Sequence, residues 1–283
     1  MEVEGVGGEL PLHTTQITPR ELQSIISRDD YIRLQENIEN GKINDVNMLF
    51  TNETDKSLLM KACETGSIEC VKVLLANKAD VNYENNSNCT ILSSSCTSGK
   101  LEIVNLILSH SALDINTVYT SLVFWIENSS LIPFSIDMGK ILLSRIPDIN
   151  RILKDGKTLL NRASFDGNIT AVRLFLESGA DRNSIDSNGV DPLYCSSYLG
   201  HLEVAKILLE WDSPNHISRE NITKAFGVTC YHRHLEMVKY LIDQGVDVNA
   251  LDDGKLVIDS AIRHNDVVLA ELLIANMLDL GAI

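Results

Sequence analysis

Residues 186–210 read DSNGVDPLYCSSYLGHLEVAKILLE, and this stretch decides the fold. It begins with a turn signal at Asn188-Gly189, and Pro192 follows at a position that suits the first turn of a helix. A first short segment ends at Gly200. Behind the glycine, apolar residues recur at helical spacing and form one face: Leu202, Val204, Ile207, Leu208 and Leu209. The stretch therefore predicts a turn followed by two helices with a break between them.

The break recurs along the chain with a constant period. The interval from Gly66 to Gly99 equals the interval from Gly167 to Gly200. The stretch between Gly99 and Gly167 is about twice as long and holds two units, one of which has lost its glycine. A glycine at this point suits a first helix that ends in a left-handed residue. The last two units carry instead Arg233 and Asn265, which predict either strain or a modified turn, and therefore looser C-terminal units.

Each unit also repeats a second-helix pattern and a closing turn signal. The second helices read SIECVKVLL, KLEIVNLIL, NITAVRLFL and HLEVAKILL. The turn signals read ADVN at 79–82, LDIN at 113–116, PDIN at 147–150, ADRN at 180–183 and VDVN at 246–249. A period of this length indicates a stacked-repeat architecture, in which each helix pair buries its apolar face against its neighbours.

These units resemble the ankyrin repeat, a β-turn and two antiparallel helices in about 33 residues, opened by TPLHxA. The matching stretches are SLLMKA (57–62), TILSSS (90–95), TLLNRA (158–163) and DPLYCS (191–196); only Pro192 keeps the proline, and no unit keeps the histidine. The resemblance covers residues 31–283. It implies an all-α ankyrin-repeat α-solenoid of paired antiparallel helices with β-hairpin or turn tips, in about seven to eight repeats including degenerate terminal ones.

The expected organisation has three parts. Residues 1–17 are Gly-rich and are expected to form a flexible tail, and residues 18–53 an N-terminal helix and a degenerate capping repeat. A capping box at Thr18-Pro19-Arg20-Glu21 predicts a helix over 19–27, and two short helical segments are expected at 31–39 and 43–50. The repeat array fills 54–283, with units near 54–86, 87–117, 118–152, 153–185, 186–218, 219–250 and 251–283. The third unit reads LVFWIENSSLIP over its first helix, which is expected to be longer or distorted.

Composition excludes several function classes. The net charge of -15 and the pI of about 4.8 would repel a phosphate backbone, so nucleic-acid binding is not expected. The acidic surplus indicates mostly a solvated face, and it could also attract a basic protein partner. The longest apolar run, 122–126, is too short for membrane insertion. The segment 1–19 lacks the pattern of a secretory signal. With six unpaired cysteines this favours the cytoplasm, with the nucleus as an alternative, and we expect a monomer.

No residue pattern predicts catalysis, a cofactor or a metal site. The chain has no P-loop, HExxH, GxGxxG or GxSxG motif. His232 and His234 are separated by a single residue, so they do not share a helix face and are poor joint metal ligands. One repeat position holds a small side chain in every unit where it can be aligned: cysteine at Cys63, Cys96 and Cys230, and serine at Ser164 and Ser197. This indicates that the position is a small buried site.

The family resemblance implies a partner surface on the turn tips and the first helices. Phe165, Tyr198 and Tyr231 follow one another at the repeat interval and are expected to stack as a column. Such aromatics are either binding hot spots or ordinary surface residues that cover helix ends. The candidate partner-binding residues are Phe165, Tyr198, Leu199, Tyr231, His232, Arg263, Asp155, Lys157, Ser187, Asn188, Val190, Asp252 and Asp253.

The asparagine that closes each turn signal has two readings. In its context it resembles the family's asparaginyl hydroxylation site, for which Asn82 and Asn249 are the candidates. A hydrogen bond to the turn itself explains it equally and is favoured.

The resemblance implies a non-catalytic scaffold that binds a partner protein through the turn tips and the concave helix face. The alternative is the substrate-recognition part of a larger assembly or longer chain, such as a ubiquitin-ligase adaptor or an enzyme-linked ankyrin array.

Overall fold

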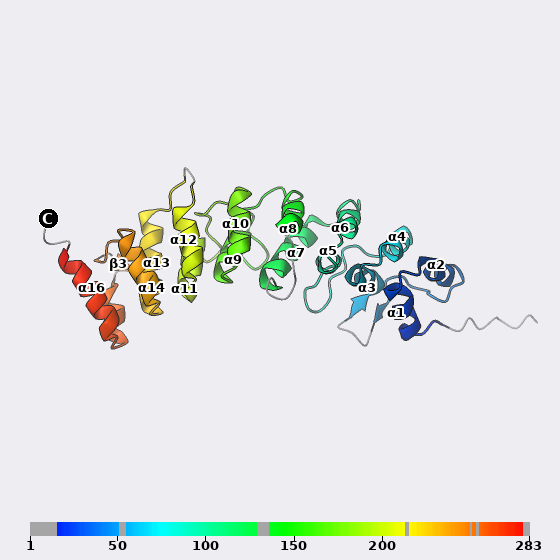
Figure 1. Ribbon diagram of the computed structural model, residues 1–283, viewed down its shortest axis with the longest axis horizontal. Helices are drawn as coiled ribbons and strands as arrows, with labels where there is room; N and C mark the ends of the chain where they lie inside the picture. Colours follow the sequence, from blue (N-terminus) through cyan, green and yellow to red (C-terminus); the bar gives the residue numbers. More distant parts are fainter. Residues whose placement is uncertain are drawn as a thin grey trace, which may run out of the picture. The chain divides into compact units, whose positions relative to one another are not determined.

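The computed structural model describes residues 16–50, 55–128, 136–212, 215–249, 251–252 and 255–279, with the backbone alone at 251–252, 255–256 and 278–279. In this part of the chain the elements are sixteen helices and four two-residue strands (Figure 1). The chain divides into two compact units, Met1–Ser121 and Leu122–Ile283, and the division falls within α7 (Ile115–Asn128). The flexible tail expected at 1–17 lies almost wholly outside the described residues.

The first unit consists of helix pairs and one small hairpin. Its elements are α1 (Pro19–Ser27), α2 (Tyr31–Glu39), β1 (Leu49–Phe50), β2 (Lys56–Ser57), α3 (Leu58–Thr65), α4 (Ile68–Ala76), α5 (Ile91–Thr97) and α6 (Leu101–Leu108). The antiparallel strands pair Leu49 with Ser57 and Phe50 with Lys56. The expected capping box is present, since the Glu21 N–H donates to Thr18 Oγ1 (3.3 Å) and the Thr18 N–H donates to Glu21 Oε2 (3.2 Å).

The prediction of a helical segment at 43–50 is wrong, because these residues form turns and a short strand. The Asn47 N–H donates to Asp45 Oδ1 (2.8 Å), which closes a turn, and the segment ends in β1. The N-terminal helix pair is therefore α1 and α2, with the left-handed Asp29 (φ 56°) between them. The Asp29 carboxylate accepts hydrogen bonds from the backbone N–H groups of Cys70 (2.9 Å) and Glu69 (3.3 Å), in the first turn of α4.

The second unit repeats the helix pair. Its elements are α8 (Ile136–Leu143), α9 (Leu159–Phe165), α10 (Ile169–Glu177), α11 (Pro192–Leu199), α12 (Leu202–Glu210), α13 (Arg219–Tyr231), α14 (Leu235–Asp243), β3 (Leu251–Asp252), β4 (Lys255–Leu256), α15 (Ile258–Arg263) and α16 (Val267–Asp279). Figure 1 shows each first helix beside its second helix, for example α11 beside α12. With 14 residues, α7 is longer than α9 or α11, as expected.

The core follows the repeat register. The position of Ala163 and Ser196 is fully buried, which lets neighbouring first helices approach closely. Leucines such as Leu74 and Leu208 are fully buried in the second helices, and each such side chain stabilises by about 1.5–3 kcal/mol. The break residues are left-handed as predicted, including Arg233 (φ 63°) and Asn265 (φ 50°), where a side chain makes that conformation strained.

Candidate functional site

Five aromatic rings form a continuous row at the ends of the first helices in the second unit. Phe165 and Tyr198 stack as predicted, with ring centroids 6.4 Å apart and an interplanar angle of 22°. The prediction that Tyr198 stacks on Tyr231 is wrong, because His232 lies between them, 4.4 Å from Tyr198 and 5.1 Å from Tyr231. His264 continues the row 5.3 Å from Tyr231. These five residues are called the ring row below.

The backbone that carries the ring row is held from the next repeat. The Phe165 carbonyl oxygen accepts a hydrogen bond from His201 Nε2 (2.9 Å), and the Tyr198 carbonyl oxygen accepts one from His234 Nε2 (3.2 Å). A Cβ added at Gly200 would lie 2.6 Å from His234 Nδ1, so the close approach of the histidine requires the glycine. His201 and His234 therefore have a structural role at the helix ends.

The middle of the ring row is open to solvent. Tyr198 is 40% exposed and Tyr231 is 54% exposed, and Leu199 is exposed beside them. Phe165 is partly covered by Lys157, whose Nζ lies 4.1 Å from the ring centroid. Exposed aromatic side chains on a rigid frame are typical anchors for a protein partner.

Charges surround the Phe165 end of the row. Arg162 pairs with Asp155 (2.7 Å) and Glu127, and its Nε lies 3.9 Å from Asp166. Burial raises the pKa of Asp166, and Arg162 opposes the shift. Three carboxylates thus surround one guanidinium, so this end of the row is acidic apart from Lys157.

The other end of the row is rich in histidine. The His232 and His234 rings are 6.0 Å apart and nearly parallel. Burial lowers the pKa of His232, and the neighbouring His234 and His264 lower it further. In the described residues no group of His, Cys, Asp and Glu is placed to hold a metal ion.

The remaining candidate residues lie at the tips and outside the row. Asp186 Oδ1 accepts from the N–H groups of Asn188 (2.7 Å) and Val190 (3.1 Å), so these two residues form a turn with Ser187. Arg263 is exposed at the end of α15, where His264 rather than Arg263 continues the row. The Asp252 backbone pairs with Lys255, and Asp253 lies outside the described residues.

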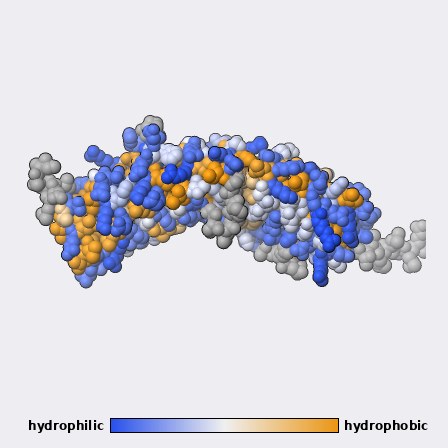
Figure 2. Space-filling model, in the orientation of Figure 1, coloured by the Kyte–Doolittle hydropathy of each residue, from blue (hydrophilic) through white to orange (hydrophobic). Residues whose placement is uncertain are grey.

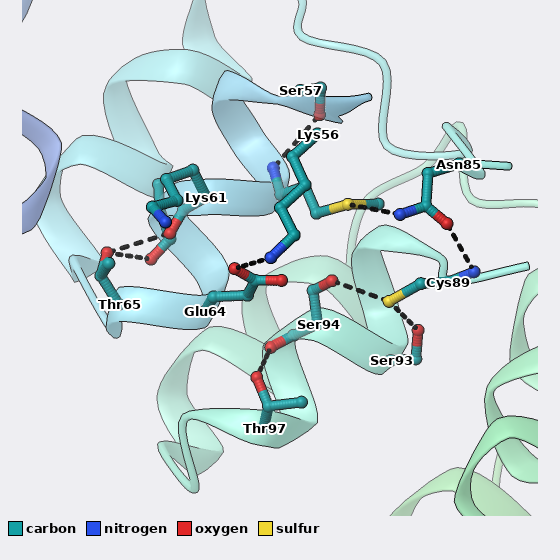
Figure 3. Close-up of polar contacts among 12 residues, drawn as sticks. Lys56, Ser57, Lys61, Glu64, Thr65, Asn85, Cys89, Ser93, Ser94 and Thr97 are labelled. Atoms are coloured by element: carbon teal, nitrogen blue, oxygen red, sulfur yellow. Dashed lines mark hydrogen bonds and ion pairs between the residues drawn. The ribbon is translucent and has the colours of Figure 1, made fainter. Parts of the chain in front are cut away.

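The first unit presents a different surface at the same repeat positions. Glu64 and Thr97 stand where Phe165 and Tyr198 stand, and Figure 3 shows their polar surroundings. Glu64 pairs with Lys56 (3.0 Å), and Thr97 Oγ1 donates to the Ser94 carbonyl oxygen (2.7 Å). The aromatic surface therefore belongs to the second unit.

The asparagines of the turn signals connect successive turns, which the sequence analysis missed. The Asn82 N–H donates to Asp80 Oδ1 (2.9 Å), but the side chain reaches the next turn, where Oδ1 accepts from the Asp114 N–H (2.7 Å). Asn82 Nδ2 donates to the Ala112 carbonyl oxygen (2.6 Å). The Asn249 N–H likewise donates to Asp247 Oδ1 (2.9 Å). The repeated Asp-x-Asn was the available signal, and hydroxylation of Asn82 and Asn249 stays a prediction.

The buried cysteine slot is confirmed. Cys63 and Cys230 are fully buried, and so are Ser164 and Ser197 at the same position. Burial raises the pKa of the Cys96 thiol to about 12, so this thiol is protonated at neutral pH and a poor nucleophile. All six cysteines are free.

Comparison with known proteins agrees with this architecture. The family model described as ankyrin repeats (3 copies) matches residues 34–119 and again 134–221, and the one described as ankyrin repeats (many copies) matches residues 228–274. None of the curated proteins matches the chain. Across the described residues, every helix is too short or too polar to cross a membrane. Ankyrin repeats generally bind other proteins and are typically non-catalytic. Because the matches cover more than half of the chain and follow its repeat register, this chain belongs to the ankyrin-repeat family.

Proposed function

We propose that this protein is a non-catalytic scaffold that binds an extended segment of a partner protein across the ring row. The observation that carries the proposal is the continuous contact from Phe165 through Tyr198, His232 and Tyr231 to His264. The rings come from the ends of several successive first helices, so a bound segment would contact several repeats at once.

The rigidity of the row supports this role. The rings contact one another and their helix ends are fixed by hydrogen bonds from His201 and His234, so little side-chain freedom is lost on binding. The exposed faces of Tyr198 and Tyr231 offer apolar area, and the carboxylates around Arg162 would favour a basic residue beside Phe165. The six free thiols favour a reducing compartment, the cytoplasm or nucleus.

The test is affinity capture with the intact protein and with the triple variant Phe165→Ala, Tyr198→Ala and Tyr231→Ala, with captured proteins identified by mass spectrometry. We expect the triple variant to lose specific partners while its melting temperature changes little, because Tyr198 and Tyr231 are exposed. The matched control is Ile185→Ala, which removes an exposed apolar side chain outside the row. Retained partners, together with a lowered melting temperature, would assign the rings a structural role.

A second proposed role is that of a substrate-recognition part in a larger assembly. The exposed apolar residues of α15 and α16 favour it, because contiguous apolar area on a surface marks a site that another protein covers. Light scattering on the native complex, compared with the purified chain, tests it: a chain that stays alone in extracts of its own cells contradicts the role.

A further inference from the structure

Two tyrosines of the ring row, Tyr198 and Tyr231, offer hydrogen-bond donors as well as apolar rings. Both side chains are exposed. Among the described residues neither phenolic hydroxyl makes a hydrogen bond, whereas the Tyr240 hydroxyl donates to Glu210 (3.0 Å). A tyrosine hydroxyl usually finds a hydrogen-bond partner when the side chain is buried. A partner that covers the two rings must therefore supply acceptors for both hydroxyls.

The rings of the two tyrosines are about 9 Å apart. The Tyr198 and Tyr231 centroids lie 4.4 Å and 5.1 Å from that of His232, so the sum of these distances is the upper limit. The two tyrosines occupy equivalent positions on α11 and α13, which pack against each other, and the axes of packed helices lie about 8–10 Å apart. A segment that contacts both rings must present its anchors at this interval.

The interval matches one turn of a polyproline II helix. This conformation has three residues per turn and rises about 3.1 Å per residue, so side chains on one side recur about every 9.3 Å. On one side of a β-strand they recur about every 6.6 Å, which does not fit. An α-helix brings residues seven apart onto one face at about 10.5 Å, which is close to the interval. The spacing therefore disfavours a strand but leaves both helical conformations.

The free hydroxyls of Tyr198 and Tyr231 distinguish these two conformations. The carbonyl groups of an α-helix accept hydrogen bonds from the helix itself. A polyproline II segment has no internal hydrogen bonds, so its carbonyl oxygens are free to accept from the two tyrosines. Proline fixes φ near about −65° and holds this conformation before binding, which reduces the conformational entropy lost on binding.

The surroundings of Tyr198 suit an uncharged anchor. Lys157 covers the Phe165 ring, but Val190 stands at the position of Lys157 in the next repeat and carries no charge. Leu199 is exposed beside Tyr198. On the face that Figure 2 shows, apolar side chains lie among polar ones over the region of α11 to α14. A segment that combines apolar rings with free carbonyl groups complements such a surface.

We propose that the ring row binds a proline-rich segment of a partner protein in the polyproline II conformation. Prolines three residues apart lie over Tyr198 and Tyr231, and carbonyl oxygens of the segment accept hydrogen bonds from the two hydroxyls. Proline-rich segments dock on aromatic surfaces in this way in other recognition modules. Because this segment would be the partner of the site described above, the inference rests on the proposed function.

The experiment uses the full chain and three labelled peptides of about twelve residues, or four polyproline II turns. The first peptide has proline at every third position. The second has the same composition with proline at every second position, and the third has leucine in place of each proline. Fluorescence anisotropy measures their binding.

Two variants separate the hydroxyls from the rings. The double variant Tyr198→Phe/Tyr231→Phe removes both hydroxyls and keeps both rings. The control Tyr31→Phe removes the hydroxyl of an exposed tyrosine on α2, outside the ring row. Both variants should keep the wild-type melting temperature, because the substituted side chains are exposed.

We expect the first peptide to bind the wild type at least about tenfold more tightly than the other two. The double variant should bind this peptide at least about fivefold more weakly, because two hydrogen bonds are lost, and the control should bind it like the wild type. Equal binding of the three peptides, no binding of the first, or undiminished binding by the double variant would overturn the proposal.

Failure of this proposal is distinguishable from failure of the proposed function. If the leucine peptide alone binds, and the triple alanine variant of Phe165, Tyr198 and Tyr231 loses it, the ring row is a partner surface and the proline-rich class is wrong. If no peptide binds and the triple variant keeps every partner captured by the wild type, both are wrong.

Discussion

Arg182 Nη1 lies 2.7 Å from the carbonyl oxygen of Leu208, near the C-terminal end of the neighbouring helix α12. The same guanidinium donates to the carbonyl oxygens of Trp211 (3.0 Å) and Asn215 (2.8 Å). Arg182 is buried, and burial lowers its pKa. It stands at the middle of Asp-x-Asn, where Val81 and Val248 stand in other repeats. One arginine thus caps α12 and holds the segment that follows it.

Replacement of Arg182 by the valine of other repeats should destabilise the protein. Arg182→Val leaves the Leu208 and Trp211 carbonyl groups without this donor, and we expect a loss of about 2–3 kcal/mol in the free energy of unfolding. Urea unfolding measures it. The control is Arg173→Val, on the exposed side of α10, which should change stability by less than about 0.5 kcal/mol. Equal effects of the two substitutions would contradict the capping role.

Replacement of two neighbouring serines on α11 by alanine should change the free energy of unfolding in opposite directions. Both are fully buried, but Ser196 Oγ donates to the Leu193 carbonyl oxygen (2.9 Å), whereas Ser197 Oγ has no partner among the described residues. Ser197→Ala should stabilise by about 1 kcal/mol, because the hydroxyl is desolvated without compensation, and Ser196→Ala should cost about 1 kcal/mol. Thermal unfolding of both variants checks the sign, and a destabilised Ser197→Ala would contradict the assignment.

The repeat period predicted the fold because it reports positions that every unit must satisfy. The small residue at Ala163 and the left-handed break at Gly200 follow from close packing and backbone geometry, so they recur and can be read from the sequence. The same reasoning found the stack of Phe165 on Tyr198. The repeat register also predicted the buried cysteine position, because every unit that can be aligned holds a side chain of similar size there.

The features that the sequence did not reveal depend on side-chain direction. The repeat interval places Tyr198 and Tyr231 in register but does not show that His232, the next residue along the chain, turns its ring between them. Nor does it show that Asn82 bonds to the following turn. Asn183 departs from the pattern of Asn82: its Nδ2 donates to the His216 carbonyl oxygen (3.3 Å), but its Oδ1 is buried without a partner among the described residues.

Replacement of Gly200, which contacts the His234 ring, should destabilise the protein more than replacement of Gly179, which has no neighbour at the position of a Cβ. Gly200 and Gly179 are both left-handed (φ 75° and 87°), so alanine strains either position by about 1–2 kcal/mol. A Cβ at Gly200 also displaces His234 and its hydrogen bond to Tyr198, whereas a Cβ at Gly179 meets nothing within 4 Å. Gly200→Ala should therefore cost about 1 kcal/mol more than Gly179→Ala in urea unfolding. Equal costs would show that the histidine contact contributes nothing.

Stability should fall in mild acid because of His232. The folded protein lowers the pKa of this residue below the usual 6.5, through burial and through His234 and His264. Between the folded pKa and 6.5 the unfolded chain binds more protons, so stability rises with pH across that window. The stability that depends on neutral His232 is fully present above pH 6.5 and is lost as the pH falls toward the pKa of this residue in the folded protein. Unfolding in urea at several pH values from about 7.5 to 5 should show this slope.

The variant His232→Gln keeps a polar side chain of similar length but removes the titration, so it should flatten the pH dependence below about 6.5. His264→Gln removes one of the charges that lower the His232 pKa, and it should shift the transition to higher pH while leaving a slope. A pH dependence that is identical in wild type and His232→Gln would show that His232 is not the group responsible. Because His232 lies between Tyr198 and Tyr231, the same titration curve followed by tyrosine fluorescence reports whether protonation opens the ring row.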